Sequence, residues 1–270
     1  MKFARAAAGA LAALATACAL AQAPQLGQVS KDSVWVPTPE RVIHRMLQMA
    51  DTTRDDLVID LGSGDGRIPI YAARQFGARA IGVELEANLV KLSRENAQVQ
   101  GVAHLAQFLQ QDLYEADLSK ATIVALYISP DVMTRITPRL FALKPGTRVV
   151  SHQFRLDDWE PDESIFVAER SGYLWIVPAD VRGAWTVRVA GDTFGAQISQ
   201  TRQKLQARGE RAGEPIRIIA PRLRGTEISF TAFDADGSAR YYEGRIDGSR
   251  MGGSSGGYGL TPLPWTATRD

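Results

Sequence analysis

The sequence has 270 residues, of which 45% are hydrophobic and 23% are charged, and its formal net charge is +1. This length and composition are those of a globular protein with one large domain or two modest ones. Because the net charge is near zero and no run of Lys or Arg forms a basic stripe, no nucleic-acid partner is expected. The three histidines lie far apart and no CxxC pair occurs, so no metal site is expected either.

The N-terminal segment has the pattern of a secretory signal peptide. Lys2 and Arg5 precede an Ala- and Leu-rich stretch, and Ala19-Leu20-Ala21 fits a small-x-small cleavage site. The apolar stretch is too short and too rich in alanine for a membrane span, so no stable span is expected after cleavage. We therefore expect a signal peptide over residues 1–21, a linker over 22–34, and export to the periplasm or the medium. Without processing, the protein would stay in the cytoplasm.

Residues 35–179 alternate between strand and helix patterns. Val36-Pro37-Thr38-Pro39 predicts a helix start, with Thr38 as the N-cap and Pro39 in the first turn. The following segments are expected in order: strand 57–61, helix 68–76, strand 80–84, helix 87–100, strands 106–110 and 122–128, helix 132–143 and strand 148–154. Strands at 164–168 and 173–177, separated by Arg170-Ser171-Gly172, indicate a closing antiparallel hairpin. The pattern predicts an α/β, Rossmann-like fold with a seven-stranded sheet.

Residues 180–270 have a different texture, with period-two alternation of apolar side chains. Strands are expected over 184–189, 193–200, 216–220, 227–233 and 240–246. Asp234-Ala235-Asp236-Gly237 is a hairpin signal, whereas the stretch from Gly252 to Gly259 contains too much glycine for a core element. The scattered arginines between Arg202 and Arg224 are expected to form a solvated face. These residues therefore predict a small antiparallel β-domain of unknown role.

The most specific motif is a glycine-rich turn after the first strand. It reads Asp60-Leu61-Gly62-Ser63-Gly64-Asp65-Gly66-Arg67, and Glu84 stands at the end of the next strand. A dinucleotide site would have G-x-G-x-x-G and a helix N-terminus free to receive a pyrophosphate. Carboxylates at Asp60 and Asp65 would repel a pyrophosphate but suit the cationic amino-acid end of S-adenosylmethionine (SAM).

The D-x-G-x-G-x-G pattern followed by an acidic strand end is the signature of class I SAM-dependent methyltransferases, and this sequence resembles them. Three further segments match in order: Val36-Pro37-Thr38-Pro39, Gly82-Val83-Glu84-Leu85 and Arg148-Val149-Val150-Ser151. With them the chain is similar to the small lysine methyltransferases that include the enzyme acting on the c subunit of mitochondrial ATP synthase. The resemblance covers residues 35–159 and implies SAM as cofactor and a protein lysine as acceptor.

Two features depart from that family. The first is the predicted export, since SAM is a cytoplasmic metabolite and its supply outside the cytoplasm is unexplained. The second is the added β-domain at residues 180–270, which the eukaryotic enzymes lack.

The resemblance also implies roles for individual residues. Asp60 and the backbone from Gly62 to Gly66 would hold the methionine part, Glu84 would bind both ribose hydroxyls, and Asp112 would accept from the adenine amino group. The expected cofactor-binding set is Asp60, Gly62, Ser63, Gly64, Asp65, Gly66, Glu84, Leu85, Asp112 and Leu113. Asp65 could instead cap the helix that follows, and Asp112 could be an ordinary loop carboxylate.

The reaction needs little chemistry from the protein, because the methyl group of a sulfonium is already activated; the site must align the acceptor and exclude water. A lysine acceptor must first lose its proton, and the free pKa of lysine is about 10.4. Tyr127, at the carboxyl end of the fourth strand, is the candidate catalytic residue that orients the amine, with His152 as a second candidate. Tyr127 could also be a core tyrosine at a strand end.

Three functions stay open at this stage. The first is a protein-lysine methyltransferase. The second is a small-molecule methyltransferase in which the β-domain closes over the substrate as a lid. The third is a SAM- or nucleoside-binding module without catalysis. The sequence does not indicate the oligomeric state.

Overall fold

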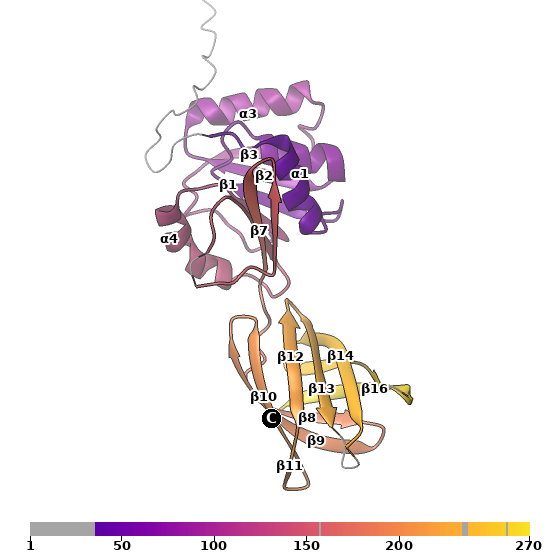
Figure 1. The fold of residues 1–270 in the computed structure, drawn as a ribbon. Helices are drawn as coiled ribbons and strands as arrows, with labels where there is room; N and C mark the ends of the chain where they lie inside the picture. Colours follow the sequence, from indigo (N-terminus) through magenta and orange to yellow (C-terminus); the bar gives the residue numbers. More distant parts are fainter. Residues whose placement is uncertain (1–35, 157, 234–236, 258) are drawn as a thin grey trace, which may run out of the picture.

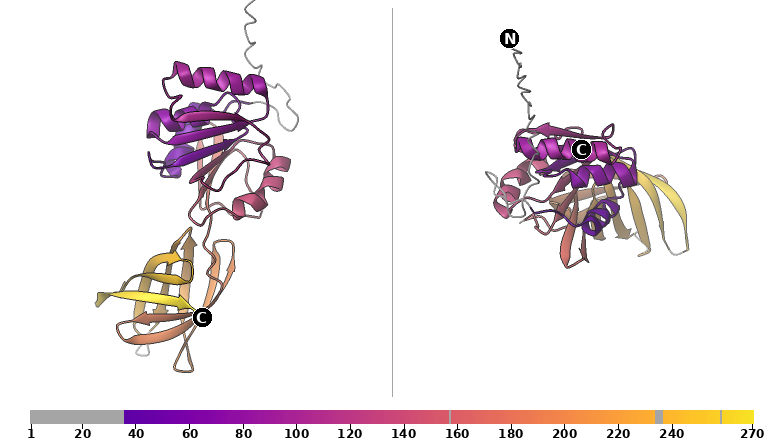
Figure 2. Two further views of the ribbon diagram at one scale, coloured as in Figure 1. Left: turned by 180° about the vertical axis from the view of Figure 1, so that it is seen from behind. Right: turned by 90° about the horizontal axis from the view of Figure 1, so that it is seen from above.

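The computed structural model describes residues 36–270 apart from 157, 234–236 and 258. The predicted signal peptide and linker, residues 1–34, lie outside the described residues, so export stays a prediction. In the part of the chain that is described, no helix is both long and apolar enough to cross a membrane. Figures 1 and 2 show an α/β part followed by an all-β part.

The α/β part is built on a seven-stranded sheet of order β3-β2-β1-β4-β5-β7-β6, in which β7 alone runs opposite to the other six strands. This arrangement confirms the predicted Rossmann-like methyltransferase fold. Its elements are α1 (Glu40–Met49), β1 (Leu57–Leu61), α2 (Arg67–Tyr71), the π-helical turn η1 (Ala72–Phe76), β2 (Arg79–Glu84), α3 (Ala87–Val99), β3 (Ala106–Gln110), β4 (Ile123–Leu126), α4 (Pro130–Phe141), β5 (Arg148–His152), β6 (Glu163–Val167) and β7 (Arg170–Ile176).

Consecutive residues of the central strands pack on opposite faces of this sheet. Val58 of β1 lies in one core cluster with Met46 of α1, whereas the next residue, Ile59, lies in another with Ile136 of α4. Both faces are therefore covered by helices, and the strands carry continuous apolar runs instead of alternating ones. Because helices cover both faces of the sheet, a ligand can reach only the ends of the strands.

The hairpin that closes the sheet turns at a different place from the predicted one. Its two turn residues are Ala168 and Glu169, with φ of 50° and 56°, as a two-residue type I′ turn requires. The prediction that Arg170-Ser171-Gly172 separates the strands is wrong, because these residues pair within β7. A Cβ on Gly172 would lie 2.9 Å from Ile165 and 3.0 Å from Met46, so this glycine serves close packing and not a turn.

The C-terminal part is a closed antiparallel sheet of order β11-β10-β12-β13-β14-β15-β16-β8-β9, in which β9 also pairs with β10. It confirms the predicted antiparallel β-domain and shows that the sheet is a barrel. Its strands are β8 (Gly183–Val189), β9 (Asp192–Thr201), β10 (Lys204–Arg211), β11 (Glu214–Ile216), β12 (Ile218–Arg224), β13 (Glu227–Phe233), β14 (Ala239–Asp247), β15 (Arg250–Gly257) and β16 (Leu260–Arg269). The predicted turn at 234–236 lies outside the described residues.

The glycine-rich stretch near residue 252 is a strand, contrary to the prediction. It forms most of β15 and pairs with β14 and β16. A Cβ on Gly253 would lie 2.1 Å from the carbonyl oxygen of Glu243, and one on Gly244 would lie 2.8 Å from Cζ2 of Trp265. Gly253 thus allows close approach to the β14 backbone, and Gly244 of β14 makes room for the buried Trp265 indole, whose Nε1 donates to the Glu243 carbonyl at 2.8 Å.

The barrel touches the α/β part at the edge where the parallel strands begin. Gly225 lies beside Gly146, which precedes β5, and beside Ile176 at the end of the antiparallel β7. The amide of Ala179 donates to the Gly225 carbonyl at 2.8 Å, and the Arg202 guanidinium lies 3.5 Å from the Phe141 ring centroid. The barrel is therefore attached at the amino edge of the parallel strands, opposite their carboxyl ends.

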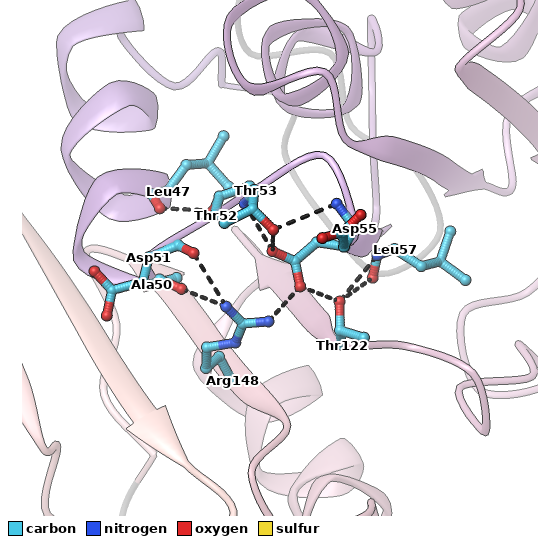
Figure 3. Close-up of polar contacts among 10 residues, drawn as sticks. Leu47, Ala50, Asp51, Thr52, Thr53, Asp55, Leu57, Thr122 and Arg148 are labelled. Carbon is cyan, nitrogen blue, oxygen red and sulfur yellow. Dashed lines mark hydrogen bonds and ion pairs between the residues drawn. The ribbon is translucent and has the colours of Figure 1, made fainter.

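A partly buried ion pair stabilises the same amino edge (Figure 3). Asp56, which precedes β1, pairs with Arg148 at the start of β5. Thr122 donates its hydroxyl to the Asp56 carboxylate at 2.7 Å, the Thr53 amide donates to it at 2.8 Å, and Arg148 also donates to the Ala50 carbonyl at 2.7 Å. Burial raises the pKa of Asp56, but the hydrogen bonds from Thr122 and Thr53 and the charge of Arg148 bring that pKa below its ordinary value.

Replacing Arg148 by Met should destabilise the fold by about 3–5 kcal/mol, because it leaves the Asp56 carboxylate buried without its cation. Since the folded pKa of Asp56 lies below its ordinary 3.8, the stability that Asp56 contributes is present above pH 3.8 and is lost as pH falls through the folded value. Urea unfolding at neutral and acidic pH should show this acid-dependent loss in the parent protein and a smaller one in Arg148→Met.

Arg79→Met is the matched control, because Arg79 is exposed at the start of β2. Its effect should stay within about 0.5 kcal/mol. Equal destabilisation by the two substitutions would contradict a special role for the Asp56–Arg148 pair.

Candidate active site

Nearly all of the predicted site residues line one pocket. It lies at the carboxyl ends of β1, β2, β3 and β4, where ligands bind in doubly wound sheets. Every predicted cofactor-binding residue except Gly66 lines it, and so does Tyr127. The remaining lining residues were not predicted from the sequence to belong to the site: Val36, Pro37, Thr38, Arg67, Ile68, Val83, Glu86, Leu89, Gln111, Ile128 and Val132.

The loop after β1 depends on its three glycines. Gly62, Gly64 and Gly66 have φ of 78°, 55° and 82°, in the left-handed region that side chains disfavour. A Cβ on Gly66 would also lie 2.7 Å from the Phe108 ring, and one on Gly62 would lie 3.1 Å from Ile128. Gly66 thus allows the turn into α2 to pack against Phe108, outside the pocket. Gly62 and Gly64 line the pocket with their backbone.

Glu84 is fixed by the backbone on both sides of it. Its Oε2 accepts from the Gly64 amide at 2.9 Å, and its Oε1 accepts from the Glu86 amide at 3.0 Å. The residue is 8% exposed. Each carboxylate oxygen keeps a second lone pair, so an oriented carboxylate stands ready to accept two hydroxyl groups. This geometry suits the two ribose hydroxyls predicted for it.

Asp60 is a buried carboxyl group without a cationic partner among the described residues. It is 2% exposed, and no described residue donates a hydrogen bond to its side chain. Burial raises its pKa well above the ordinary value, and the nearby charges of Glu84 and Asp65 raise that pKa further. A cationic ligand beside Asp60 would relieve this cost. The residues present therefore fit the ammonium end of SAM.

Ser63 lines the pocket, but its Oγ is buried against Gly82 of β2, where a Cβ would lie 2.6 Å from it. This Oγ has no hydrogen-bond partner among the described residues.

Asp65 and Asp112 are both engaged locally. The Asp65 carboxylate is ion-paired with Arg67 at 2.6 Å, and Arg67 donates in turn to the Thr38 carbonyl at 3.0 Å. Asp65 also accepts the backbone amide of Arg67, the first residue of α2, at 3.4 Å, although the N-cap position itself is Gly66. Through Arg67, Asp65 connects the loop with the segment before α1. Asp112 accepts the Tyr114 amide with one oxygen at 2.9 Å, and its other oxygen is left for a ligand.

Thr38, Tyr127 and His152 form a further wall. Contrary to the prediction, Thr38 does not cap α1, because the N-cap is Pro39 and no side chain caps that helix. Its hydroxyl lies 3.1 Å from Nδ1 of His152 instead. The His152 ring lies against the ring of Tyr127, with 4.0 Å between the ring centroids and 41° between the ring planes. Burial lowers the pKa of His152 to about 4, with a further contribution from the charge of Arg170.

Among the described residues, no group of three or more His, Cys, Asp or Glu side chains could hold a metal ion. The pocket therefore offers carboxylates, backbone amides, hydroxyls and apolar walls as its chemistry.

Comparison with known proteins gives the same assignment. Residues 60–163 match the ANTKMT methyltransferase domain. A protein-lysine N-methyltransferase of Saccharolobus islandicus is 40% identical over 149 residues, which are 53% of this chain and 92% of that protein. The lysine N-methyltransferase of Rattus norvegicus that is named for the ATP synthase c subunit is 36% identical over 131 residues, which are 48% of this chain and 60% of the rat protein.

A solved structure is also similar. The crystal structure of an RNA methyltransferase from Salinibacter ruber in complex with S-adenosyl-L-homocysteine is 49% identical, with a TM-score of 0.53, and the match covers 54% of this chain and 96% of that one. Each of these matches covers about half of the chain.

Replacing Glu84 by Gln should weaken SAM binding about tenfold or more, because charge-assisted hydrogen bonds from the ribose hydroxyls would become neutral ones. Isothermal titration calorimetry with the purified chain measures this affinity. Glu115→Gln is the matched control, since Glu115 is exposed just outside the pocket. Equal affinities of Glu84→Gln and the parent protein would contradict the ribose assignment.

Proposed function

The chain belongs to the SAM-dependent methyltransferases of the group that includes protein-lysine N-methyltransferases, and we propose that it methylates a lysine amine of another protein. The observation that carries the proposal is the 40% identity to the Saccharolobus islandicus protein-lysine N-methyltransferase, over 92% of that relative. Support also comes from the rat enzyme, whose name states a lysine acceptor.

The cofactor side of the pocket is formed by its acidic residues and the glycine loop. Asp60 would hold the ammonium end of SAM, Glu84 would bind the ribose hydroxyls, and Asp112 with Leu113 would hold the adenine; all four residues line the pocket. When bound, SAM supplies an electrophilic methyl group on a sulfonium. The protein contributes position and electrostatics: buried Asp60 and Glu84 concentrate negative charge where a cationic molecule must bind.

The acceptor side of the pocket is mostly apolar. Val36, Pro37, Ile128 and Val132 line it together with Thr38 and Tyr127. A lysine amine attacks through its lone pair, so it must either enter the pocket as the neutral amine or lose its proton there. An apolar wall disfavours the charged ammonium form. His152 behind this wall is uncharged at neutral pH, because burial lowers its pKa to about 4, and therefore adds no positive charge to repel the substrate.

The lid function of the β-domain is not favoured by this arrangement. The barrel contacts residues such as Gly146 and Ile176 at the amino edge of the parallel strands, whereas the pocket lies at their carboxyl ends. A small molecule in the pocket would not be covered by the barrel in this arrangement.

RNA is the second candidate acceptor. It is favoured by one observation, the 49% identity to the Salinibacter ruber chain whose structure is described as an RNA methyltransferase. The near-neutral charge of this chain, +1 in total, gives RNA no general electrostatic attraction. Lysine is therefore the acceptor we propose, and the experiment below separates the two.

Methyl-labelled SAM, incubated with the purified chain and an extract of the source cells, should place label in methyl-lysine recovered from hydrolysed protein. The initial rate should climb from about pH 7 toward about pH 9, because more of the lysine is then deprotonated. Glu84→Gln, which should weaken SAM binding, is the control for non-enzymatic labelling.

Label that is removed by ribonuclease would overturn the lysine proposal in favour of RNA, and label found only in small molecules would overturn it in favour of a metabolite. Tight SAM binding without any transfer would favour a binding module.

A further inference from the structure

We propose that Thr38 and His152 form a positioning pair for the acceptor amine, in which the Thr38 oxygen accepts an N–H of the amine and His152 sets the direction of the Thr38 hydroxyl. The inference rests on the proposed function, because it requires an amine acceptor.

The pair connects the pocket surface with the interior. Thr38 lines the pocket although it is only 2% exposed, and His152 is 1% exposed and does not line it. Nδ1 of His152 lies 3.1 Å from the Thr38 hydroxyl oxygen, across a sequence separation of 114 residues. Thr38 therefore borders the pocket, and its hydroxyl contacts His152, which lies behind it.

The Thr38 hydroxyl is available for this task because the helix does not use it. A threonine at the start of a helix normally caps it through a hydrogen bond to a backbone amide. Here α1 begins after Pro39 without any side-chain cap. The hydroxyl contacts the His152 imidazole instead of a helix amide.

The state of His152 decides what Thr38 can offer. The imidazole is neutral, since burial and the charge of Arg170 lower its pKa to about 4. A neutral imidazole has one N–H and one acceptor nitrogen. When the proton is on Nε2, Nδ1 accepts the Thr38 O–H, and the free lone pairs of the Thr38 oxygen can take an amine N–H. When the proton is on Nδ1, the Thr38 O–H is free to donate and would occupy the lone pair that must attack.

The same histidine supports the other polar group of this wall. Its ring lies 4.0 Å from the Tyr127 ring, and Tyr127 also lines the pocket. A neutral primary amine has two N–H donors and one lone pair, so oxygens of Thr38 and Tyr127 would anchor both donors and leave the lone pair free. Nε2 of His152 has no partner among the described residues, although it is buried. Such an unpaired group costs stability, as expected where function holds it in place.

The test compares Thr38→Val, which keeps the shape but loses the hydroxyl, with Thr38→Ser, which keeps the hydroxyl. Thr38→Val should lower kcat for methyl-lysine formation about tenfold to a hundredfold, while the Kd for SAM stays within about twofold. Thr38→Ser should recover most of the lost rate. His152→Phe, which keeps a ring against Tyr127, should lower kcat similarly, and the double variant should be no slower than the slower single one. Thr137→Val on α4, outside the pocket, is the matched control.

A second readout does not depend on activity. Nitrogen NMR of the free protein should show His152 neutral at neutral pH, with its proton on Nε2, and Thr38→Val should shift the Nδ1 resonance. A proton on Nδ1 would overturn the proposal, as would an unchanged kcat in Thr38→Val when the parent protein forms methyl-lysine. If the parent protein forms no methyl-lysine, the proposed function fails and the amine-holding role fails with it.

Discussion

The structure depends on a concentration of carboxylates at one edge of a parallel sheet. Asp60 and Glu84 lie near each other because β1 and β2 are parallel, so that their carboxyl ends meet at one edge; Asp60 is paired with Gly82, two residues before Glu84. Among the described residues that line the pocket, Arg67 is the only cation, and it is ion-paired with Asp65. The pocket is thus kept negatively charged inside a fold that hides the strand faces, and a cationic ligand is what its electrostatics require.

The two sides of the pocket are built differently. On the cofactor side, the glycine loop, the Glu84 carboxylate and the turn at Asp112 are local in sequence and are locked by backbone amides. On the acceptor side, the wall is assembled from distant segments: the stretch before α1, the end of β4 and the end of β5. Short local motifs suit the binding of one fixed cofactor. A wall assembled from separate segments can change its acceptor through substitutions in any one of them.

This difference explains how much the sequence could predict. The α/β fold and the cofactor side followed from continuous apolar runs, the Asp60-to-Gly66 loop and Glu84, because these signals are local. The cap predicted for Thr38 is wrong, since a threonine before Pro39 looks like a helix cap and nothing local indicates that its partner is His152. The turn at Ala168 and Glu169 carries no Gly, Asn or Asp signal, and Gly172 resembles a turn glycine although it serves packing. The sequence does not reveal strand β15, because the close backbone contact that Gly253 makes with Glu243 and Gly244 of β14 depends on strand pairing between separate segments.

Asp60 is buried in the pocket without a cationic partner in the described part of the chain, and we expect it to ionise beside a cationic ligand. Calorimetry of SAM binding in two buffers of different ionisation enthalpy tests this expectation most directly, because it counts the protons released. Since the pKa of Asp60 is raised in the free protein, binding should release a proton from Asp60 over the range where it titrates, and affinity should improve as pH rises. In Asp60→Asn the release should vanish, and binding should be weaker and lose this pH dependence. Proton release and pH dependence that are the same in the parent protein and in Asp60→Asn would contradict the account.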